Sequence, residues 1–132
     1  MKRFLIFGLL LAVVLPAWAA LGPLTPEELH ERADHVLLGQ VNNVSCKEVE
    51  VDGGLDRVYR LNFRVDERIK GSLRSGLTLP IQCRQTAERP AGWTGRQGQN
   101  EIPAEDQKVR VFVRETPEGI YELLEPNGWQ AL

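Results

Sequence analysis

The sequence predicts a mainly β fold with one short helix near the N-terminus, and three observations carry this prediction. Residues 59–66 alternate strictly between apolar and polar side chains, which is typical of a half-buried strand. Val109, Val111 and Val113 repeat the same two-residue period. Turn-forming Gly, Pro and Asp residues separate the apolar runs. Together the runs predict five strands, at about residues 35–44, 59–66, 77–83, 108–114 and 120–124.

The predicted helix precedes the first strand. Thr25 is suited to cap its N-terminus, Pro26 suits the first helical position, and Glu28 can reach back to complete a capping box. We expect the helix to run from about Pro26 to Asp34, with one apolar stripe formed by Leu29, Ala33 and Val36.

Two interruptions stand out in the β pattern. Gly39 lies inside the first predicted strand, where it indicates a bulge or a sharp bend. Between Thr86 and Gln107 lie 20 residues rich in Gly and Pro, and a compact domain rarely carries so long an irregular loop without a reason.

The first residues, 1–19, have the pattern of a cleaved signal peptide. Lys2 and Arg3 precede an apolar stretch that is too short for a permanent membrane helix, and the small residues Ala17 and Ala19 suit signal peptidase. We therefore expect a secreted or periplasmic protein, without a stable membrane anchor, whose residues 20–132 form one domain.

The charge balance of that domain argues against one class of partner. Without Lys2 and Arg3, 14 Lys and Arg residues remain against 18 Asp and Glu residues. A dedicated nucleic-acid binder needs net positive charge to attract phosphates, so we expect no nucleic-acid partner.

Cys46 and Cys83 are the two cysteines of the chain. In an oxidising compartment the default expectation is a disulfide, which would stabilise the fold by about 3–4 kcal/mol. The alternative is a pair of free or metal-binding thiols, which no C-x-x-C spacing supports.

Three stretches, 33–41, 63–71 and 108–121, resemble the netrin-like family, which includes the tissue inhibitors of metalloproteinases. They are similar to its "A-D-x-V-x-x-G-x-V" strand, its "F-x-V-x-x-x-x-K-G" strand and turn, and its late "Y-L-V-F" strand and hairpin. The resemblance implies a five-stranded OB-like barrel, in agreement with the strand count. The inhibitors begin with a zinc-gripping cysteine, whereas the predicted start here is Ala20, so that mechanism does not carry over. Glu105-Asp106 also replaces a glycine often found before the late strand of the family.

The long loop holds the candidate binding residues, Trp93, Arg96 and Asn100. A large aromatic side chain with polar companions is common in binding surfaces. The alternative is that the loop, residues 87–106, folds back as a lid and that Trp93 fills the core. Trp129 is expected to anchor the C-terminal tail in the same way.

Basic residues follow two predicted strands, and the interpretation depends on where those strands lie. If the strands were neighbours, the residues would form a positive patch on the barrel wall, and otherwise they are a solvated face with acidic partners. The residues concerned are Arg60, Arg64, Arg68 and Lys70 on one strand and Lys108, Arg110 and Arg114 on the other.

No set of residues has the pattern of a catalytic or metal site. His30 and Asp34 could bind a metal only weakly, and the serines lie in no G-x-S-x-G motif. We therefore expect no cofactor and a non-enzymatic binding or interaction module whose partner is another exported protein. The alternatives are an inhibitor of an exported protease that works through a surface other than its N-terminus and, last, a small hydrolase.

Overall fold

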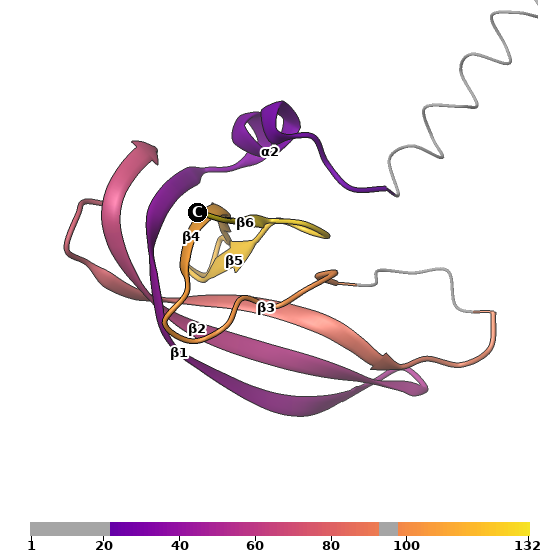
Figure 1. The fold of residues 1–132 in the computed structure, drawn as a ribbon. Helices are drawn as coiled ribbons and strands as arrows, with labels where there is room; N and C mark the ends of the chain where they lie inside the picture. The colour runs from indigo at the N-terminus through magenta and orange to yellow at the C-terminus, as the bar shows by residue number, and fades with distance from the viewer. Residues whose placement is uncertain (1–21, 93–97) are drawn as a thin grey trace, which may run out of the picture.

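The computed structural model describes residues 22–92 and 98–132, which form a mainly β structure with one short helix. The predicted signal peptide lies outside the described residues. Figure 1 shows the helix α2 (Pro26–Arg32), the long strands β1 (His35–Val51), β2 (Gly54–Lys70) and β3 (Thr78–Glu88), and the shorter strands β4 (Lys108–Glu115), β5 (Tyr121–Leu123) and β6 (Trp129–Ala131). Among the described residues, no helix is long and apolar enough to cross a membrane.

Five of the strands close into a ring. Their order is β1-β2-β3-β5-β4, and β4 pairs back onto β1 between His35–Val113 and Gln40–Lys108. The five predicted strands are confirmed as these five, although β1 and β2 each run to 17 residues. The sequence did not predict β6, a three-residue strand that pairs antiparallel with Val109–Val111 of β4, on the edge of β4 that faces away from β1.

The helix begins as predicted. The Thr25 hydroxyl accepts the N–H of Glu28 at 3.2 Å, and the Glu28 carboxylate accepts the N–H of Thr25 at 3.1 Å, so the capping box is complete. The helix ends at Arg32 and not at Asp34, because Ala33 already has extended backbone angles. Lys70 of β2 donates to the carbonyls of His30 and Glu31, which the helix end leaves without internal partners.

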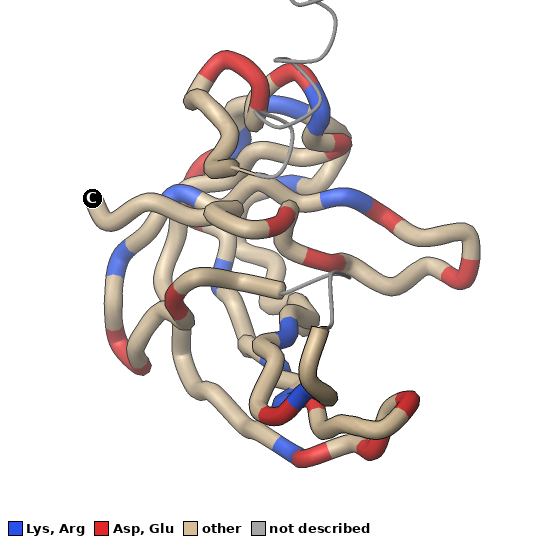
Figure 2. The backbone as a smooth tube through the Cα atoms, turned by 90° about the vertical axis from the view of Figure 1, so that its right-hand side faces the viewer, with Lys and Arg blue, Asp and Glu red and all other residues tan. Residues whose placement is uncertain are grey.

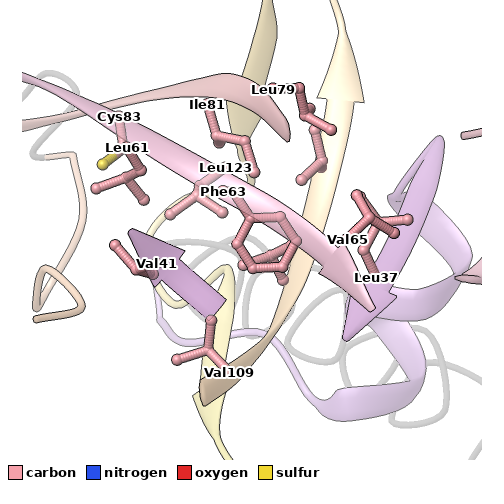
Figure 3. Packing of buried hydrophobic residues seen from close by; sticks show 12 residues of the cluster. Leu37, Val41, Leu61, Phe63, Val65, Leu79, Ile81, Cys83, Val109 and Leu123 are labelled. Carbon is pink, nitrogen blue, oxygen red and sulfur yellow. The ribbon is translucent and has the colours of Figure 1, made fainter. Parts of the chain in front are cut away.

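The core has two parts, one on each side of the ring wall. The larger part fills the ring with alternate side chains of the strands, among them Leu61, Phe63 and Val109, and Figure 3 shows these side chains converging. The smaller part lies between α2 and the outside of the wall, where Leu29 packs with Val36 and other residues. The alternation that predicted β2 is thereby confirmed, since Leu61, Phe63 and Val65 are all buried.

Gly39 marks the predicted bulge. The register between β1 and β2 shifts between Leu38 and Gly39. A Cβ on Gly39 would lie 2.0 Å from the carbonyl oxygen of Arg64 and 2.7 Å from the ring of Phe63. Only glycine allows this close approach of β1 to β2, which lets the strands bend around the core.

The long β1–β2 hairpin extends past the ring. Figure 1 shows the far halves of β1, β2 and β3 continuing beyond the short strands β4, β5 and β6. The described second part of the long loop, from Gly98 onward, returns along β3, where Gly98 pairs with Gln85. The buried amide of Gln99 donates to Leu124 O at 2.6 Å and accepts the N–H of Gly128 at 3.2 Å, which ties this part of the loop to the C-terminal turn, residues 124–128 between β5 and β6.

Candidate functional site

Of the three predicted binding residues, the structure describes one. Trp93 and Arg96 lie outside the described residues, so the binding role of that loop stays a prediction. Asn100 is exposed, its N–H donates to Pro126 O at 2.8 Å, and its carbonyl accepts the amide of Gln85 at 3.2 Å. The backbone of Asn100 is therefore held against the C-terminal turn.

A small hollow of about 350 Å³ lies beside Asn100, with Pro126, Asn127 and Trp129 in its wall. The Trp129 indole donates to Glu101 O at 2.9 Å, and its ring packs against the larger core cluster. The prediction that Trp129 anchors the tail is confirmed. Trp129, which lines the hollow, therefore has a structural role.

The predicted Cys46–Cys83 disulfide is wrong for this structure, because both cysteines are free. Cys46 on β1 lies opposite Tyr59 on β2, and Tyr59 in turn lies opposite Cys83 on β3. Two strand spacings, about 9–10 Å, therefore separate the two backbones. A disulfide needs Cα atoms within about 7 Å of each other. The sequence separation of the cysteines does not reveal that a third strand lies between them.

The two thiols are expected to differ in reactivity. Cys46 is exposed, whereas Cys83 is buried and its burial raises the pKa of the thiol to about 12. The thiolate is the reactive form. Without any reductant, iodoacetamide at neutral pH should modify Cys46 alone in the folded protein and both cysteines in urea, as measured by mass spectrometry. A chain that takes up no label in urea without reductant would contradict the free thiols.

A groove of about 780 Å³ crosses the outer face of the sheet, the face that points away from Leu61 and Phe63. Ser45 on β1, Arg60 on β2 and Gln82 on β3 lie directly opposite one another in the ladder and form its floor. The turn between β4 and β5 bounds its far end. The lining residues are Ser45, Cys46, Lys47, Val58, Arg60, Pro80, Gln82, Gly119, Ile120 and Tyr121.

The side chains of the groove combine positive charge with apolar surface. Lys47 and Arg60 are exposed cations, and none of the described residues that line the groove is acidic. Ile120 is 45% exposed and adds apolar surface to the groove. Burial and the nearby Glu115 raise the pKa of Tyr121, so its phenol is neutral at physiological pH. The groove therefore offers cations and apolar contacts to one ligand.

The two basic rows do not form one patch. β1 lies between β2 and β4, so the rows are not neighbours. Arg64 bonds to Asp66 at 3.2 Å and to Gln40 at 3.1 Å, and Arg114 lies 3.8 Å from Glu122. In the view of Figure 2 the basic and acidic segments are interspersed. The solvated-face interpretation is the one that the structure supports.

A buried ion cluster holds the start of the long loop. Asp56 is 2% exposed, its carboxylate lies 3.3 Å from the Arg84 guanidinium, and it also bonds to Arg89. Glu125 approaches Arg84 from the C-terminal turn at 4.0 Å. Because Arg89 directly follows β3, the cluster fastens the first residue after β3 to β2 near the tip of the β1–β2 hairpin. Asp56 was not among the predicted site residues, since nothing in a local sequence pattern marks a strand aspartate as buried.

His35 caps one end of the ring and is packed too closely to bind a ligand. Its Nε2 lies 3.4 Å from Glu115 Oε1, and its ring contacts Tyr121 edge-on with 5.7 Å between centroids. A Cβ on Gly71 would lie 2.2 Å from His35 Nδ1, so the backbone at Gly71 covers the Nδ1 side of the imidazole. The carboxylate of Asp34, which with His30 was the candidate for weak metal binding, accepts the N–H of Glu115 at 2.8 Å. The described residues contain no group of three His, Cys, Asp or Glu that could hold a metal.

No protein-family model, curated protein or solved structure matches this chain.

Proposed function

We propose that this chain is an OB-type interaction module that binds an extended segment of another exported protein in the outer-face groove. The observation that carries the proposal is the groove itself, with its two exposed cations, its exposed Ile120 and its lack of acidic lining among the described residues. These features favour a segment that brings an acidic and an apolar side chain together.

The strand order supports the OB-type assignment. The chain passes from β3 to β4, yet β3 pairs with β5 and β4 closes back onto β1, which is the Greek-key connection of that barrel. OB folds bind their ligands over strands 2 and 3, between the loops that follow strands 1 and 4. The groove lies over β2 and β3 and meets the β4–β5 turn. The resemblance to the netrin-like family implies the same fold.

The chemistry of the groove favours a polypeptide over a nucleic acid. Single-stranded nucleic acids stack their bases on several aromatic side chains, and Tyr121 is the one aromatic residue among the described lining residues. The chain as a whole carries a net charge of −2, which would repel a phosphate backbone. The signal-peptide pattern of residues 1–19 supports a partner in the exported compartment.

The test is selection from a random peptide library displayed on phage, with the folded protein as bait. We expect enrichment of sequences that place Asp or Glu near a large apolar residue. Binding of these peptides should weaken about tenfold or more in Arg60→Glu, because the charge reversal replaces attraction with repulsion in the groove.

Arg74→Glu is the matched control, since Arg74 is exposed in the turn between β2 and β3 and does not line the groove. Both variants should melt at the temperature of the parent protein. The proposal fails if no family of peptides is enriched, or if Arg60→Glu and Arg74→Glu weaken binding equally.

A further inference from the structure

The edge of β1 is open where the strand leaves the ring. β4 pairs with β1 only from His35 to Gln40, and Gln107 and Asp106 then bond to Val41. The carboxylate of Glu105 accepts the N–H of Val44 at 3.1 Å. From Ser45 to Val51, no described residue forms a backbone hydrogen bond on this side of β1.

We propose that the partner's extended segment binds as an added antiparallel strand along this open edge, residues 45–51. This inference rests on the proposed function, because the edge and the groove share residues 45–47. An added strand uses the main-chain donors and acceptors of the edge for affinity, and alternate side chains for specificity. The side chains on one face of the added strand would enter the groove.

The charges of the edge disfavour a second copy of this chain as the occupant. In an antiparallel pair of identical edges, a two-fold axis at Lys47 sets two ammonium groups opposite each other. An axis at Glu48 sets two carboxylates opposite each other, and an axis at Val49 sets Glu48 opposite Glu50. An axis nearer the start of the edge requires Val44, whose N–H already has a partner. A strand of different sequence avoids these repulsions.

The same charges define the complementary strand. Lys47 lies on the face of β1 that lines the groove, whereas Glu48 and Glu50 lie on the opposite face, since strand side chains alternate. Across β2, Glu48 faces Arg57 and Glu50 faces Leu55, so acid exceeds base on that face. The structure therefore assigns to the partner a strand with an acidic side chain beside Lys47 and basic side chains beside Glu48 and Glu50.

The probe is the blocked peptide Val-Lys-Val-Lys-Glu-Thr-Val, which places its two lysines beside Glu50 and Glu48 and its glutamate beside Lys47. Binding is measured by fluorescence anisotropy of the labelled peptide. Two further peptides carry N-methyl groups at alternate residues, one at the odd and one at the even positions. Because an edge strand uses only every other N–H of its neighbour, one pattern should weaken binding at least tenfold and the other should leave it unchanged.

Charge exchange identifies the edge. The double variant Glu48→Lys, Glu50→Lys should weaken the probe at least tenfold, and a peptide with glutamates in place of both lysines should recover that loss. Glu67→Lys, at an exposed site paired with Leu38 at the other end of β1, should change nothing.

Three results would overturn the inference: no binding of the probe, equal binding of both N-methyl patterns, or self-association that Glu48→Lys, Glu50→Lys alters. The proposed function is tested independently of the added strand. If library peptides bind in an Arg60-dependent way while the edge probe does not bind, the groove stands as the site and the added strand is wrong.

Discussion

Replacing Asp56 by alanine is expected to lower the free energy of unfolding by about 3 kcal/mol, measured by urea denaturation at neutral pH. The carboxylate is 2% exposed and lies between the guanidinium groups of Arg84 and Arg89. Removal of one partner from a buried ion pair costs about 3–5 kcal/mol, because the remaining charge stays in a place that water reaches poorly. We expect the lower end of that range, since the Arg84 side chain is 37% exposed and can regain water.

Asp66→Ala is the matched control. Asp66 also pairs with an arginine, Arg64, at 3.2 Å, but both side chains are more than 40% exposed. Exposed pairs contribute about 0–1 kcal/mol, so this variant should stay close to the parent protein. Equal losses in the two variants would show that the burial of Asp56 has no energetic consequence, contrary to the structure.

The Asp56 cluster also bears on the proposed binding edge. Asp56 lies opposite Val49 in the β1–β2 ladder, and Val49 belongs to the open edge. The ion pairs tie this part of the hairpin, which has no ring to support it, to β3 and to the first residue of the long loop. A partner strand would thus meet an edge that is already ordered, which reduces the entropy lost on binding.

Local sequence signals predicted the local structure well. The capping box of Thr25 and Glu28, the alternation in β2 and the bulge at Gly39 depend on neighbours in the chain, and all three are confirmed. The length of β1 was underestimated, because its far half, residues 45–51, has exposed or half-buried side chains on both faces and so lacks an apolar period.

The site could not be predicted in the same way, because it depends on which strands are neighbours. The groove takes its lining from β1, β2, β3, the β4–β5 turn and the first residue of β5, and its lining residues are spread over positions 45–121. The disulfide prediction failed for the same reason, since β2 separates the two cysteines. A one-dimensional pattern gives each strand its faces but not its order in the sheet.

Asp106 has a backbone conformation that glycine most often adopts. The resemblance placed Glu105-Asp106 where a glycine is often found, and Asp106 adopts the left-handed backbone conformation with φ of 64°. Aspartate tolerates this conformation better than most residues other than glycine. Its N–H donates to Val41 O, and Glu105 bonds to Val44 N–H, so the pair defines where the covered part of β1 ends and the open edge begins.

Alkaline pH is expected to destabilise this protein through Cys83. Burial, and secondarily the charge of Glu125, raise the pKa of its thiol from 9.0 to about 12 in the folded state. Between these two values the unfolded chain releases a proton that the folded chain keeps. The stabilisation is therefore complete below pH 9 and is lost as the pH rises toward 12. Between about pH 8 and pH 11 the loss should reach about 3 kcal/mol, at 1.36 kcal/mol per pKa unit.

The measurement is urea denaturation of the parent protein, Cys83→Ala and Cys46→Ala at both pH values. Tyr59 and Tyr121 have pKa values raised mainly by burial, and this burial weakens folding in the same direction above pH 10 in all three proteins. Cys46 and Cys83 add smaller contributions to the raised pKa of Tyr59, which the two cysteine variants remove. Cys83→Ala should be less stable than the parent at pH 8, because it leaves a cavity, but should lose much less between the two pH values. Cys46→Ala, which removes an exposed thiol, should follow the parent. If Cys83→Ala and the parent lose the same free energy, the Cys83 thiol ionises as freely in the folded chain as in the unfolded chain, and its place inside the ring is wrong.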